Sequence, residues 1–170
     1  VALRNNGEAM QYAAFFAFFI GLGIFELLYP RANAHHGKRW VVNITLTILC
    51  VLTLGVLPLS TLVAADFAAE NRIGLLNYSG IPAVLAFIVG FLLRSLLSFL
   101  IHVAFHKAPW LWRIHAVHHT DTDIDVTTAV RMHPLEFVVS ALILLPCVVA
   151  FGIPALAVIL YEIFDAGMAA

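Results

Sequence analysis

Six of the eight histidines lie between His102 and His133, and their spacing predicts a metal site. The first five form two groups with helical spacing, namely His102 and His106, then His115, His118 and His119. Residues three or four apart share one face of a helix, so each group can direct its imidazoles to one point. Neutral imidazole suits iron, copper and zinc. Because two such groups occur within 18 residues, we interpret them as metal ligands rather than as chance polar clusters.

Three aspartates follow the second histidine group and alternate along the chain, at Asp121, Asp123 and Asp125. This pattern resembles a calcium-binding loop, but Val126 takes the place of the required glycine and Met132 that of the glutamate, which excludes an EF-hand. We expect Asp121 and Asp125 either to be solvated or to accept hydrogen bonds from the ligand imidazoles.

The last of the six histidines, His133, is flanked by two charged residues, Arg131 and Glu136. These two side chains either orient His133 or form a surface ion pair, and the sequence leaves both readings open. The remaining histidines, His35 and His36, have no partner at helical spacing, and we expect them to lie in a solvated loop.

Four apolar stretches must position these residues, at 11–29, 41–64, 81–101 and 137–161. Hydrophobic residues make up 62% of the chain and charged residues only 11%, whereas a soluble domain carries about 25% charged residues. Each stretch is close to the roughly 20 residues that cross a bilayer core. This composition argues against a soluble enzyme, a secreted disulfide scaffold and a nucleic-acid-binding protein. It predicts an all-α transmembrane bundle of about four spans, with residues 1–170 forming a single domain.

The predicted helices cover residues 11–29, 41–64 and 81–106, and a broken segment covers 135–168. Pro58 lies within the second helix and predicts a kink there. In the last segment, Pro146, Gly152 and Pro154 divide the apolar run into two short halves. Two short helices can enter the bilayer and return, provided that protein shields the break. We therefore expect a broken or re-entrant hairpin that brings Ala170 back to the face of the histidines.

Basic residues are distributed unevenly between the two sides of the predicted bundle. The 30–40 and 107–133 connections carry six of them, and the opposite side carries two, Arg4 and Arg72. By the positive-inside rule, the histidine-rich 107–133 connection is predicted to be cytoplasmic.

The motifs HVAFH at 102–106, LWRIHAVHHTD at 111–121 and DVTTAVRMHPLE at 125–136 resemble the fatty acid hydroxylase/sterol desaturase superfamily. That resemblance implies a membrane di-iron enzyme that uses O2 to hydroxylate or desaturate a lipid such as a fatty acyl chain or a sterol. It implies a cytochrome b5-like, ferredoxin or flavoprotein electron donor and, where the motifs match, the metal ligands His102, His106, His115, His118, His119 and His133.

Two features depart from the pattern of that superfamily. Ser95 stands where many members have an aspartate, and the third histidine box does not occur in these 170 residues. We expect the natural chain to continue beyond Ala170 and to supply further histidines. The alternatives are a non-catalytic membrane subunit of a larger complex that retains the histidine scaffold and, more weakly supported, a haem-binding electron carrier.

Overall fold

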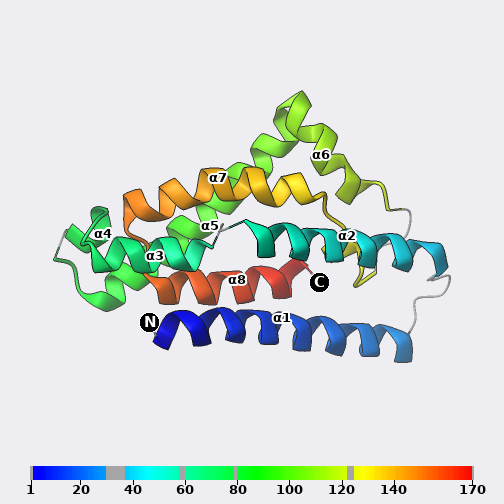
Figure 1. The fold of residues 1–170 in the computed structure, drawn as a ribbon, viewed down its shortest axis with the longest axis horizontal. Coiled ribbons are helices and arrows are strands. Elements are labelled where there is room, and N and C mark those ends of the chain that lie inside the picture. Colours follow the sequence, from blue (N-terminus) through cyan, green and yellow to red (C-terminus); the bar gives the residue numbers. More distant parts are fainter. Residues whose placement is uncertain (1, 30–36, 58–59, 79, 122–124, 170) are drawn as a thin grey trace.

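The computed structural model describes residues 2–29, 37–57, 60–78, 80–121 and 125–169, and all of its regular elements are helical. In chain order they are α1 (Ala2–Leu28), α2 (Gly37–Val56), α3 (Thr61–Glu70), α4 (Leu75–Tyr78), α5 (Ala83–Lys107), α6 (Pro109–His119), the 3-10 helix η1 (Thr128–Val130), α7 (Pro134–Phe151) and α8 (Ala155–Ala169). The predicted all-α fold is confirmed. Figure 1 shows the long helices stacked side by side, with α6 projecting from the stack.

Among the described residues, three segments are long and apolar enough to cross a membrane, namely Gly37–Tyr78, Ala83–Lys107 and Pro134–Phe151. A shorter apolar helix, Phe16–Leu28, lies in the first predicted stretch. These lengths and compositions indicate an integral, multi-pass membrane protein.

The predicted 41–64 helix is divided in two in the structure, because α2 ends at Val56 and α3 begins at Thr61. Ser60 caps the new helix by accepting a hydrogen bond from the backbone N–H of Val63 at 3.2 Å. The predicted kink at Pro58 lies outside the described residues. Helix α3 continues to Glu70, and the short helix α4 covers Leu75–Tyr78. The buried face of α3 packs against α7.

The last apolar stretch is broken where the sequence predicted, between α7 and α8. Gly152 ends α7 in the left-handed conformation, with φ of 64°, and α8 begins directly after Pro154. The turn at Gly74 packs tightly against this break, since a Cβ on Gly74 would lie 2.2 Å from the backbone N of Gly152. Figure 1 shows α7 and α8 running in opposite directions, as a helical hairpin requires. The position of Ala170 lies outside the described residues.

Helix α8 packs along α5 and brings its C-terminal part toward the histidines. The two helices pack closely at Gly90, where an added Cβ would lie 3.5 Å from Cβ of Ala157 on α8 and 2.7 Å from Cδ of Pro154, just before α8. The buried side chains of Val148, Ile153 and Val158 form the core beside this contact. Farther along, the carboxylate of Asp165 on α8 is close enough to His102 on α5 to interact with it electrostatically.

A sharp corner joins α5 to α6 and determines how the two histidine groups face each other. Ala108 is extended, with φ of −88° and ψ of 120°, and it ends α5 and precedes α6. The corner forms here because a residue before proline avoids the helical conformation, whereas proline itself suits a first helical turn. Four buried apolar side chains hold the corner together, namely Ile101, Phe105, Leu111 and Leu144.

Candidate metal centre

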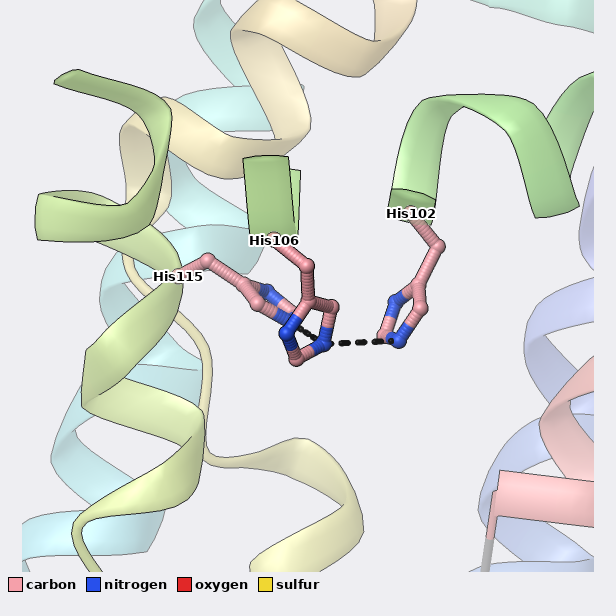
Figure 2. A group of neighbouring side chains, drawn as sticks. All are labelled: His102, His106 and His115. Carbon is pink, nitrogen blue, oxygen red and sulfur yellow. Dashed lines mark hydrogen bonds between the residues drawn. The ribbon is translucent and has the colours of Figure 1, made fainter. Parts of the chain in front are cut away.

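The imidazoles of four histidines converge at the α5–α6 corner. The Nε2 atom of His106 lies 3.1 Å from that of His102 and 3.2 Å from that of His115. The Nε2 atom of His119 lies 3.2 Å from that of His115. Ligand atoms of His102, His106 and His115 all lie within 4.8 Å of one another. Figure 2 shows the three imidazoles pointing toward one another. Nitrogen atoms that converge in this way fit a transition-metal ion, because neutral imidazole is a good ligand for iron, copper and zinc.

The histidine cluster is buried on one side and open on the other. His115, at the centre, is 1% exposed, whereas His102, His106 and His119 are exposed. A small molecule or lipid can therefore reach the cluster from the outer side of α5, while α6 and α7 close its inner side.

A carboxylate of α7 orients the buried histidine. The Oε1 atom of Glu136 lies 2.7 Å from Nδ1 of His115, and both side chains are buried. With the carboxylate ionised, Nδ1 donates the hydrogen bond, so the lone pair of Nε2 faces the other imidazoles. Such carboxylate–histidine pairs fix the tautomer and orientation of a metal ligand. Glu136 was predicted to orient His133 or to form a surface ion pair, and the structure corrects both expectations because its partner is His115.

The two remaining candidate ligands occupy different surroundings. His118 is half-buried, with its ring centroid 5.1 Å from that of His119, and its Nδ1 atom is buried without a hydrogen-bond partner among the described residues. His133 caps α7, where its Nδ1 accepts a hydrogen bond from the backbone N–H of Leu135 at 3.1 Å. Of the six predicted ligands, four converge, His118 adjoins them, and His133 uses one ring nitrogen to begin a helix.

Two of the aspartates after α6, Asp121 and Asp125, bind side chains of α2. Asp121 accepts a hydrogen bond from Nε of Arg39 at 2.6 Å, and Asp125 accepts one from Nε1 of Trp40 at 3.0 Å. Arg39 also lies 3.2 Å from Asp125. Both carboxylates are buried and bound by polar side chains, so the expectation that they are solvated is wrong. Their support of the metal ligands stays a prediction. We call this contact of Asp121 and Asp125 with Arg39, Trp40 and Asn43 the α2 clamp.

Arg131 fixes the end of α6 rather than pairing with Glu136. Its Nε donates to the carbonyl oxygen of Val117 at 2.8 Å, and another guanidinium nitrogen donates to Oγ1 of Thr120 at 2.8 Å. A third bond, 2.9 Å long, reaches Oδ1 of Asn43, which is fully buried in α2. The guanidinium group thus satisfies the carbonyl end of the histidine-bearing helix and joins it to the α2 clamp.

The surroundings of His115 and His119 favour their neutral forms, and those of Asp121 favour its ionised form. Burial, together with neighbouring His106 and His118, lowers the pKa of His115 to about 4. Burial and neighbouring imidazoles also lower the pKa of His119. The hydrogen bond from Arg39 holds the pKa of Asp121 well below its ordinary value. Near neutral pH, His115 and His119 are therefore ready to bind a metal ion without first losing a proton.

A second polar cluster lies deeper in the bundle, around Arg94. Its guanidinium group donates to Ser98, lies 3.6 Å from Oε1 of Glu162, and stacks 4.6 Å from the ring centroid of Tyr161. These contacts pair Arg94 with α8 and stabilise the packing of α5 against α8.

Sequence reasoning missed the α2 clamp and the partners of Arg94. One signal was present, because an asparagine inside an apolar helix requires hydrogen-bond partners. Asn43 satisfies that requirement with Asp121, Thr127 and Arg131. The loop histidines His35 and His36 lie outside the described residues.

The sequence was then compared with known proteins. A comparison with curated proteins gives no match, and a comparison with solved structures gives none either. Residues 87–169 match the family described as fatty acid hydroxylase. The matched region contains most of α5, all of α6 to α8 and all six candidate histidines. This part of the chain, slightly less than half of its length, is therefore similar to the fatty acid hydroxylase family.

Proposed function

We propose that the chain is a membrane-bound, non-haem di-iron oxidoreductase that hydroxylates or desaturates a lipid with O2. The observation that carries this proposal is the convergence of the Nε2 atoms of His102, His106 and His115 beside a membrane-spanning helix. Iron, when bound, supplies oxygen activation and the attack on an unactivated C–H bond.

The residues of the chain hold, orient and shield the site in this proposal. His102, His106, His115 and His119 hold a metal ion, and Glu136 keeps the Nε2 atom of His115 directed toward it. His118 and His133 are the proposed remaining ligands, since a second ion needs donors beyond the four that converge. The buried, unpartnered Nδ1 of His118 and Oε2 of Glu136 support a cation nearby, because buried polar atoms without partners are costly.

The apolar helices supply the remaining requirements of a lipid oxygenase. The exposed sides of His102 and His106 lie at the end of α5, whose apolar surface can guide an acyl chain or sterol. Electrons come from an external carrier in this proposal, as the resemblance to the fatty acid hydroxylase/sterol desaturase superfamily implies. We propose that the histidine face is cytoplasmic, as the distribution of basic residues predicts.

Iron loading of the full-length protein tests the proposal. Replacing His102, His106, His118 or His119 singly by alanine should remove most of the bound iron while the protein still inserts into the membrane. The matched control is His36→Ala, which removes an imidazole that is not among the six candidate ligands. Unchanged iron in all four cluster variants would refute the di-iron assignment. Lipid profiling of cells with and without the gene, grown under oxygen, separates an enzyme from an iron-free membrane subunit.

A further inference from the structure

A surface hollow lies at the α5–α6 corner, directly beside the histidine cluster. It has a volume of about 330 Å³ and is lined by His106, Lys107, Pro109 and Trp112. All four residues are exposed. Since Pro109 sets the corner between the two helices, the shape of this hollow follows from the same turn that brings the histidines together.

The hollow lies where a membrane-spanning helix leaves the bilayer. Lys107 is the last residue of α5, which is apolar and 25 residues long. Lysines near the ends of such helices extend their ammonium groups to the interface, and tryptophans are enriched there as well. Lipid head groups are therefore the molecules that this hollow meets at the highest concentration.

The lining of the hollow combines a cation with an apolar wall. Lys107 supplies the ammonium group, and none of the four lining residues carries a carboxylate. The Trp112 ring packs against His106, with ring centroids 5.3 Å apart, and forms the flat side. His106 belongs to the hollow and to the metal cluster at once, because its Nε2 lies 3.1 Å from that of His102.

We propose that this hollow binds the anionic head group, carboxylate or phosphate, of the lipid on which the enzyme acts. The role of this hollow in catalysis rests on the proposed function, whereas the binding of a head group in the hollow does not. Lys107 pairs with the anion, and the carbon atoms next to the head group lie along Trp112 and reach His106. Oxidation then occurs close to the polar end of the lipid, and uncharged lipids bind more weakly than anionic lipids of the same length.

Tryptophan quenching tests head-group binding in the metal-free, full-length protein. The probes are stearic acid with a nitroxide near its carboxyl end, the methyl ester of that probe, and a long-chain alkyl phosphate as competitor. The protein is placed in neutral phosphatidylcholine nanodiscs at about pH 8.5, far above the ordinary pKa of a carboxyl group. Trp112→Phe measures how much of the quenching comes from the hollow.

The acid should bind more tightly than the ester. Lys107→Gln should weaken binding of the acid, but not of the ester, by about two- to fivefold, which is the effect expected from the loss of an exposed ion pair. The matched control is Lys38→Gln, which removes an exposed lysine of α2 and should change nothing. The alkyl phosphate should displace the acid, whereas inorganic phosphate at the same concentration should not.

Several results would overturn the proposal. One is equal binding of acid and ester, and another is equal loss of binding in the Lys107 and Lys38 variants. Displacement by inorganic phosphate alone would indicate a site for free anions. If Lys107→Gln leaves lipid binding intact but weakens binding of an acidic ferredoxin, the hollow serves a carrier protein instead. Because the assay uses metal-free protein, its failure is distinct from a failure of iron loading.

Discussion

Replacing Glu136 should weaken metal binding although this residue lies outside the group of converging nitrogens. In the metal-free protein, its carboxylate fixes His115 through one 2.7 Å contact inside the bundle. Glu136→Gln retains an acceptor oxygen but removes the charge. Glu136→Leu removes both, so that the Nδ1–H of His115 loses its partner in a buried position.

The size of the effect follows from the geometry of this contact. A hydrogen bond between a charged and a neutral group is worth about 1.5–3 kcal/mol, and both partners here are buried. Loss of a carboxylate that supports a ligand histidine typically weakens metal binding by about 10- to 100-fold. Tenfold corresponds to about 1.4 kcal/mol, so the two ranges agree. We expect about tenfold weaker binding for Glu136→Gln and about 100-fold for Glu136→Leu.

Competition between the metal-free, full-length protein and a chelator measures these affinities, with Co²⁺ as a coloured probe ion. Glu70→Gln is the matched control, because Glu70 is exposed at the end of α3. Binding of Co²⁺ by Glu136→Leu within about twofold of the parent would show that the carboxylate merely packs beside His115. The reasoning about ligand orientation would then be wrong.

Two further predictions concern the support of the site. Arg39→Met should release the connection after α6 and destabilise the fold by about 3 kcal/mol, because the buried carboxylates of Asp121 and Asp125 lose their half-buried cation. Limited proteolysis and thermal unfolding measure this, and equal protease resistance of parent and variant would contradict it. Acidification of the metal-free protein should also loosen α6. The pKa of His115 is about 4 when folded and ordinarily near 6.5, so the unfolded state binds more protons between these values. The contribution of neutral His115 to the stability of the fold is therefore complete above about pH 6.5 and is lost toward pH 4. Near-ultraviolet circular dichroism can follow this loss. Greater stability of the protein on acidification would refute the reasoning.

The local parts of the site could be predicted from the sequence because local spacing determines them. His102 and His106 share a helix face by their four-residue separation, and the break at Gly152 follows from the conformational preference of glycine and the proline two residues later. The division of the 41–64 stretch was missed. Its apolar composition is continuous, whereas the cap at Ser60 depends on one hydrogen bond.

The long-range parts of the site could not be predicted in the same way. Asp121 and Arg39 are separated by 82 residues, and Glu136 and His115 by 21. Spacing along the sequence carries no information on which carboxylate meets which imidazole or guanidinium, because the packing of α2 and α7 against α6 decides it. The charged residues near the histidines were therefore identified, but their partners were assigned wrongly.

The energetic cost of the buried groups favours metal binding over a purely structural role. A structural bundle is stabilised by apolar side chains at such positions, since burying an ionised carboxylate costs several kcal/mol. Here Glu136 is 8% exposed, and its second oxygen, like Nδ1 of His118, has no partner among the described residues. One contact to a neutral imidazole offsets only part of that cost. A cation bound beside Glu136 and His115 would offset much more of it, which explains why a membrane protein places this carboxylate behind its most buried histidine.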